Sequence, residues 1–170
     1  MTERDDEKPD LSETEQILKL EEQITKLKRD NVDSFYEFYE LGKSYEASEL
    51  YQSALTAYDT ASGFMPNNPL GLGRKGVVLA KLELFDEAVK VYDKVISIDP
   101  ENEVAWYNRG IALTRLGRLD DALSSYDKAI EIDYNFVDAW NNSGVVHGKL
   151  GNDVQAKKHF DAAKRYMNDE

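Results

Sequence analysis

The stretch AWYNRG at residues 105–110 decides the fold, because a close copy of it, AWNNSG, stands at residues 139–144. The two stretches lie 34 residues apart, and both place a tryptophan four residues before a glycine. Self-similarity at a fixed period of about 20 to 50 residues is typical of proteins that stack one small structural unit. The spacing therefore predicts a repeat protein.

Steps of 34 residues extend this pattern upstream without an insertion or a deletion. Four blocks result: 35–68, 69–102, 103–136 and 137–170. A large apolar residue stands at position 4 of each block, glycine at position 8, alanine at position 20 and an aromatic ring at position 24. The members in chain order are Phe38, Leu72, Trp106 and Trp140; Gly42, Gly76, Gly110 and Gly144; Ala54, Ala88, Ala122 and Ala156; Tyr58, Tyr92, Tyr126 and Phe160.

These offsets predict two helices in each block. Positions 4, 7, 8 and 11 share one face of a first helix, and positions 20, 24 and 27 share one face of a second. Glycine inside a helix costs roughly 0.5–1 kcal/mol relative to alanine, so we expect close packing of each glycine against the position 20 alanine to offset that cost. Each helix pair leaves an apolar face that only the next pair can cover, which predicts a stack.

The turns between the two helices differ among the blocks. Gly117 and Gly151 suit the end of a first helix, where the backbone often becomes left-handed. Glu49 and Glu83 stand at the same place in the first two blocks. We therefore expect those two turns to close in another way.

The 34-residue pattern resembles the tetratricopeptide repeat (TPR), a helix–turn–helix unit of this length. The resemblance covers residues 35–170 and departs from the family at position 7, where only Leu41 is apolar and Lys75, Arg109 and Ser143 are not. It implies an all-α fold, a right-handed superhelix (α-α solenoid) of four repeats. The expected boundaries are TPR 1 at 35–68, TPR 2 at 69–102, TPR 3 at 103–136 and TPR 4 at 137–170.

The N-terminal 34 residues lie outside this frame. Residues 1–10 are rich in acids and predict a disordered tail. An apolar stripe of Ile17, Leu20, Ile24 and Leu27 predicts a helix over 11–30, and three of these residues fall on offsets 20, 24 and 27 of the repeat. We therefore expect a capping helix and a linker within 11–34. The alternative is a coiled-coil dimer, because the four residues occupy a, d, a, d; two heptads fall short of the three or four that such a prediction needs.

The composition excludes several functions. A formal net charge of −12 argues against a nucleic-acid or anionic-membrane surface. The chain has no cysteine, which excludes disulfides, thiolate metal sites and cysteine nucleophiles. The first residues contain no apolar segment typical of a signal peptide, and no run of 18 apolar residues follows, so we expect a cytoplasmic protein.

No motif predicts an enzyme, a metal site or a cofactor. We expect His147 to lie in the core and His159 to lie on the surface. Neither a G-x-S-x-G elbow nor a Walker-type loop is present. The carboxylate pairs Asp86–Glu87 and Asp120–Asp121 open second helices, where negative charge stabilises the positive end of the helix dipole.

The TPR resemblance implies that first helices line a concave groove through positions 2, 5, 6, 9, 12 and 13. These offsets carry more basic than acidic residues, so we expect a protein or peptide partner that is acidic or amide-rich. The candidate groove residues are Tyr39, Lys43, Arg74, Lys81, Tyr107, Asn108, Arg115, Asn141, Asn142 and Lys149. Three of them form a basic column at position 13: Lys81, Arg115 and Lys149.

The same resemblance allows a test for the carboxylate clamp that TPR cochaperones use on acidic C-termini. Of the clamp positions, only Asn108 matches in either register, so we expect no clamp. The sequence thus favours a monomeric protein–protein interaction scaffold or adaptor. The alternative is a structural protein that self-assembles through residues 11–30 or through end-to-end stacking of repeats.

Overall fold

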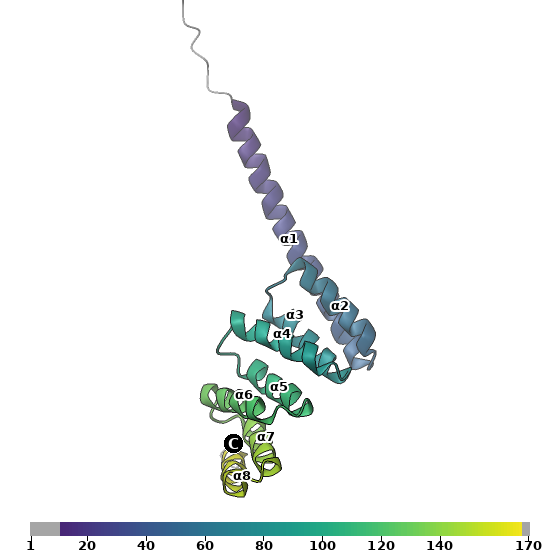
Figure 1. Ribbon diagram of the computed structural model, residues 1–170. Helices are drawn as coiled ribbons and strands as arrows, with labels where there is room; N and C mark the ends of the chain where they lie inside the picture. Colours follow the sequence, from purple (N-terminus) through teal and green to yellow (C-terminus); the bar gives the residue numbers. More distant parts are fainter. Residues whose placement is uncertain (1–10, 168–170) are drawn as a thin grey trace, which may run out of the picture.

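A computed structural model describes residues 11–167, and within that range the chain forms eight α-helices and no strand. Figure 1 shows the helices stacked one after another in a curved array. The all-α solenoid is confirmed, whereas the predicted tail at 1–10 lies outside the described residues. The helices are α1 (Leu11–Ala47), α2 (Tyr51–Phe64), α3 (Pro69–Lys81), α4 (Phe85–Ile98), α5 (Glu103–Arg115), α6 (Leu119–Ile132), α7 (Val137–Lys149) and α8 (Asp153–Met167).

The helix boundaries follow the 34-residue period. First helices α3, α5 and α7 begin at Pro69, Glu103 and Val137, which are equivalent positions. Local signals fix two of these starts, because the side chains of Asn68 and Asn102 accept hydrogen bonds from backbone N–H groups of the first turns of α3 and α5. The expected acidic pairs lie in the first turns of α4 and α6.

Each helical glycine at position 8 faces the aromatic ring at position 24 of its partner helix. A Cβ added at Gly110 would lie 2.6 Å from the Tyr126 ring, and one added at Gly42 would lie 2.5 Å from the Tyr58 ring. The prediction that the position 20 alanine is the close neighbour is therefore wrong. The ring occupies the space above the bare Cα because it reaches further across the helix pair than a methyl group does.

All four turns between paired helices close in the same way. Gly117 and Gly151 have φ of +75°, and Glu49 and Glu83 have φ of +58° and +61°. In each turn the N–H of the following residue bonds the carbonyl five residues back, as in Arg118 N to Leu113 O at 2.9 Å. The expectation of a different closure in the first two blocks is wrong, because the same bonds hold the glutamates in the left-handed conformation.

The polar residues at position 7 connect consecutive repeats. Lys75 Nζ lies 2.5 Å from Asp59 Oδ1, and Arg109 Nε lies 2.6 Å from Asp93 Oδ1. Each pair joins a first helix to the second helix of the preceding repeat. At Lys75 and Arg109 the departure from the family pattern is thus accommodated by ion pairs, whereas Ser143 is buried without one.

The N-terminal helix differs from the prediction. Residues 11–47 form one unbroken helix, so there is no linker before residue 35 and no separate capping helix. The purple end of α1 extends beyond the repeats in Figure 1 and does not fold back on α2. The physical reason is that residues 31–34 contain no glycine or proline to end a helix. Among the described residues, no helix combines the length and apolarity needed to cross a membrane.

Candidate functional site

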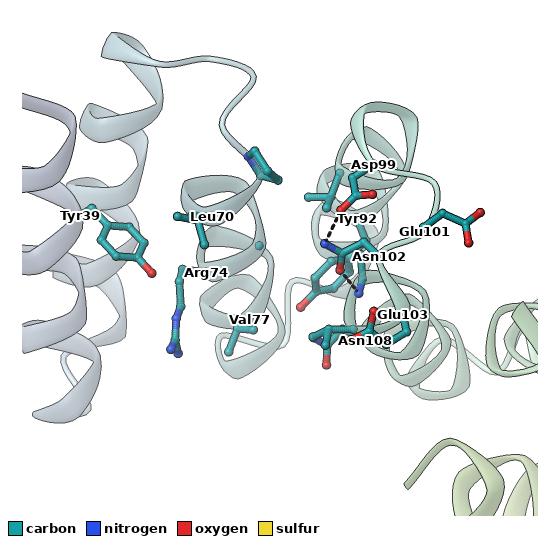
Figure 2. A pocket seen from close by; sticks show the side chains of 15 residues that line it. Tyr39, Leu70, Arg74, Val77, Tyr92, Asp99, Glu101, Asn102, Glu103 and Asn108 are labelled. Carbon is teal, nitrogen blue, oxygen red and sulfur yellow. Dashed lines mark hydrogen bonds between the residues drawn. The ribbon is translucent and has the colours of Figure 1, made fainter. Parts of the chain in front are cut away.

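A groove of about 480 Å³ opens across α1, α3 and α5, on the side where the first helices lie next to one another. Figure 2 shows Tyr39 from α1, Leu70, Arg74 and Val77 from α3, and Asn108 from α5 along its wall. Three of the predicted site residues, Tyr39, Arg74 and Asn108, therefore share one surface. Leu70 and Val104 are about half exposed and supply apolar area.

The carboxylate of Glu46 on α1 holds Arg74 at the end of the groove nearest α1. Arg74 Nη1 lies 3.4 Å from Glu46 Oε1, and Tyr58 donates a hydrogen bond to Glu46 Oε2 at 2.9 Å. Burial, and then the hydrogen bond to Glu46, raise the pKa of Tyr58 well above its usual value, so the phenol remains a donor. This network fixes the guanidinium at the groove while its side chain remains 46% exposed and able to contact a ligand.

The opposite rim of the groove is acidic. Asp99 and Glu101 come from the turn between α4 and α5, and Glu103 is the first residue of α5; the concave offsets of the repeat include none of the three. Against Arg74 they make the lining of this groove net negative, whereas the concave offsets alone carry more basic than acidic residues. Asp99 also accepts a hydrogen bond from the Asn102 amide at 3.1 Å, and Asn102 in turn caps α5.

The predicted residues further along the array are engaged within the chain. The Asn142 amide donates to the Tyr107 hydroxyl at 3.0 Å, and the Tyr107 ring packs on Phe136 at 4.8 Å. Burial, and then the charge of Asp138, raise the pKa of Tyr107. This contact joins α5 to α7, so Tyr107 and Asn142 fix the relative position of two first helices at the groove.

Comparison with protein families identifies the repeat. A family model described as "Tetratricopeptide repeat" matches residues 104–135, and one described as "TPR repeat" matches residues 76–117. Both matched segments contain AWYNRG. The chain is a tetratricopeptide-repeat protein. A comparison with curated protein sequences yields no match.

Solved structures share the fold of this TPR protein. MamA 41-end from Desulfovibrio magneticus RS-1 superposes with a TM-score of 0.76 at 23% identity, over 80% of this chain and 77% of that one. Another MamA crystal structure gives a TM-score of 0.77 at 19% identity, over 85% of both chains. The first TPR domain of Spaghetti (RPAP3), bound to the HSP90 peptide SRMEEVD, gives 0.68 at 21% identity, over 70% of this chain and 94% of that one.

The remaining predicted TPR site residues lie outside the groove lining. Lys81, Arg115 and Lys149 are exposed in the last turns of α3, α5 and α7. Lys43 pairs with Glu40 at 2.9 Å and lies over the Tyr39 ring, and Asn141 is half-buried on α7. The basic column is therefore a separate strip at the C-terminal ends of the first helices.

The histidines occupy the core of the last repeat. His159 is only 9% exposed, so its predicted surface position is wrong; its ring lies 4.9 Å from that of His147 and 5.0 Å from that of Trp140. Burial, and then the neighbouring His147, lower the pKa of His159. In the described part of the chain, no three His, Asp or Glu side chains are grouped so that they could hold a metal ion.

The repeat pattern did not predict the acidic rim, because the boundary between the second and third blocks falls inside this cluster of acidic residues. Asp99 and Glu101 end one block and Glu103 begins the next, so neither block displays the cluster. The signal that could have found it is the unbroken stretch DPENE at 99–103. Its turn lies beside the wall formed by α3 and α5.

Proposed function

We propose that this TPR protein is an interaction scaffold or adaptor that binds an extended peptide or a single helix of a partner protein in its concave groove. The observation that carries the proposal is the open groove across α1, α3 and α5, which combines exposed apolar area with Arg74 and Asn108. The Asn108 side chain makes no hydrogen bond to another described residue. Its amide is therefore available to a peptide backbone, which offers both a donor and an acceptor at each residue.

Related folds support a peptide ligand in general terms. The RPAP3 TPR domain is bound to a peptide in its solved structure, and TPR is a scaffold fold. A catalytic role has no support from the residues that line the groove. We propose that the ligand is amide-rich or acidic where it meets Arg74 and the basic column, and that it approaches the acidic rim with uncharged or basic residues.

Selection from a library of random peptides displayed on phage tests the proposal. Peptides selected on the natural sequence are expected to bind Asn108→Ala at least about tenfold more weakly, since a groove amide would lose its backbone contacts. The matched control is Lys90→Ala on the exposed side of α4, outside the groove. Equal binding to both variants, or failure to select any peptide, overturns the proposal.

Charge reversal of the basic column tests the ligand's chemistry separately. Changing Lys81, Arg115 and Lys149 to glutamate is expected to deplete acidic peptides from the selected set. An unchanged set removes the column from the site without affecting the groove. We propose that the groove holds no carboxylate clamp, and we therefore expect the peptide SRMEEVD to bind no better than a scrambled version of it.

A further inference from the structure

The unbroken α1 joins two apolar patterns that the repeat frame keeps apart. Starting from Ile17 at an a position, the heptad continues through Asn31 and Ser34 into the first repeat. Seven of the nine a and d positions from 17 to 45 are apolar. In chain order they are Ile17, Leu20, Ile24, Leu27, Phe38, Leu41 and Tyr45. The seam therefore spans four heptads on one continuous helix, the length that a coiled coil requires.

The C-terminal part of this seam is partly covered: Phe38 stacks on Phe64 of α2 and Tyr45 packs against the core of the first repeat, while Leu41 is exposed. Phe38, Leu41 and Tyr45 line a hollow of about 270 Å³ between α1 and α2, and Leu41 is 41% exposed. In the later repeats the equivalent face meets the second helix of the preceding repeat, for example through Lys75 and Asp59. The first repeat has no such neighbour, because the residues before it continue α1 away from the array.

We propose that α1 pairs with α1 of a second copy as a parallel two-stranded coiled coil. The heptad residues favour this pairing: isoleucine at a with leucine at d selects two parallel strands, and a single asparagine at a fixes the register by pairing with its equivalent. Ile17, Ile24 and Asn31 occupy a positions in this order. The dimer would carry two concave grooves, one on each side of a shared coiled coil. This proposal does not depend on whether the grooves bind peptides.

Charge distinguishes parallel pairing from antiparallel pairing. In the parallel register, the g and e positions that meet are Gln16 with Glu21 and Gln23 with Lys28, so no like charges meet. The antiparallel register that aligns the same seam places Asp30 beside Glu37 of the other copy. Two carboxylates beside an apolar seam repel each other, which favours the parallel dimer.

Light scattering of the full chain measures the stoichiometry. The expected mass is twice the 19.4 kDa of the chain. A mass of one chain across the accessible concentration range overturns the proposal, and so does a mass that grows without limit, which indicates end-to-end stacking of repeats.

Two adjacent substitutions test whether the seam holds the dimer. Ile24→Glu places a carboxylate at an a position in both strands and is expected to weaken dimerisation at least about tenfold. Thr25→Glu adds the same charge one residue away, at a b position outside the heptad seam, and is expected to retain the dimer. Equal effects of the two variants overturn the proposal, and circular dichroism checks that the repeats stay folded.

A single cysteine tests the orientation, since the natural chain contains none. Leu20→Cys lies at a d position, which meets its own equivalent in the parallel register and is expected to give a disulfide-linked dimer on oxidation. Thr25→Cys, at a b position outside the heptad seam, is the control and should remain unlinked. In the antiparallel register residue 20 lies opposite Tyr45, so a dimer that Leu20→Cys fails to link overturns the parallel arrangement.

Discussion

The third and fourth repeats both pack a glycine against an aromatic ring, but in the described array only the third lies between two neighbouring repeats. Tyr126 opposite Gly110 is 1% exposed, whereas Phe160 opposite Gly144 is 41% exposed. The ring at position 24 is therefore buried by the helix that follows it in the array, and not only by its own partner helix. Packing in this protein is a property of adjacent repeats, as expected for a solenoid.

Adding a methyl group to each glycine should separate the two repeats most clearly. Gly110→Ala would place a Cβ 2.6 Å from the enclosed Tyr126 ring, and we expect the free energy of unfolding to fall by about 1–3 kcal/mol. Gly144→Ala would meet Phe160 at 2.9 Å, but this ring can move towards solvent, so the loss should be smaller. Urea denaturation measures both. A larger loss for Gly144→Ala would contradict the role of the following helix.

The turns offer a comparison in which sequence differs while conformation does not. Glu83 holds φ of +61°, which costs a non-glycine residue about 1 kcal/mol, so Glu83→Gly should raise the free energy of unfolding by about that amount. Gly117→Ala in the third repeat should lower it by a similar amount, since Gly117 has φ of +75°. Thermal melts of both variants test this pair. Destabilisation by Glu83→Gly would show that the glutamate side chain makes a needed contact.

The ion pair at position 7 gives the third repeat a contact to the second that the fourth repeat lacks. Arg109 Nε lies 2.6 Å from Asp93, whereas Ser143, at the same position of the fourth repeat, is buried. Because Asp93 is half exposed, a double-mutant cycle of Arg109→Gln and Asp93→Asn should give a coupling of about 0.2–1 kcal/mol that weakens at high salt. A coupling independent of salt would indicate packing of the arginine stem instead.

Acid should affect the fourth repeat through its buried histidine, while the third has Ser125 at the equivalent position. Burial and the nearby His147 lower the pKa of His159, against a smaller opposing effect of Asp127. The unfolded chain therefore binds this proton more readily than the folded chain. The contribution of neutral His159 to stability is complete above its unfolded pKa of about 6.5 and decreases as the pH falls below it.

Chemical denaturation of the natural chain and of His159→Phe, across this pH range, measures that effect. The free energy of unfolding of the variant should fall less than that of the natural chain as the pH drops below neutral. The decrease that remains comes from other titrating groups. An identical pH profile for the two proteins would assign the acid sensitivity to another residue.

Most of the fold was predictable because it depends on local period and residue type. The 34-residue spacing predicted the helix pairs that the structure shows, whereas the capping roles of Asn68 and Asn102 emerged only from the structure. The groove was predictable in part: Tyr39, Arg74 and Asn108 meet because equivalent offsets of stacked repeats face the same side. The acidic rim was not, because a connecting turn brings Asp99 and Glu101 to the groove from outside the first helices.

The sequence by itself determined the helical repeat, its period and the identity of the residues that pack, since apolar spacing and glycine positions act within one or two helical turns. Tertiary structure alone decided which side chains become neighbours. It set Gly110 against an aromatic ring, made Glu83 adopt a glycine conformation, and left Leu41 without a covering helix. Each of these outcomes depends on how one helix lies against another, and that arrangement is fixed by the summed packing of the array.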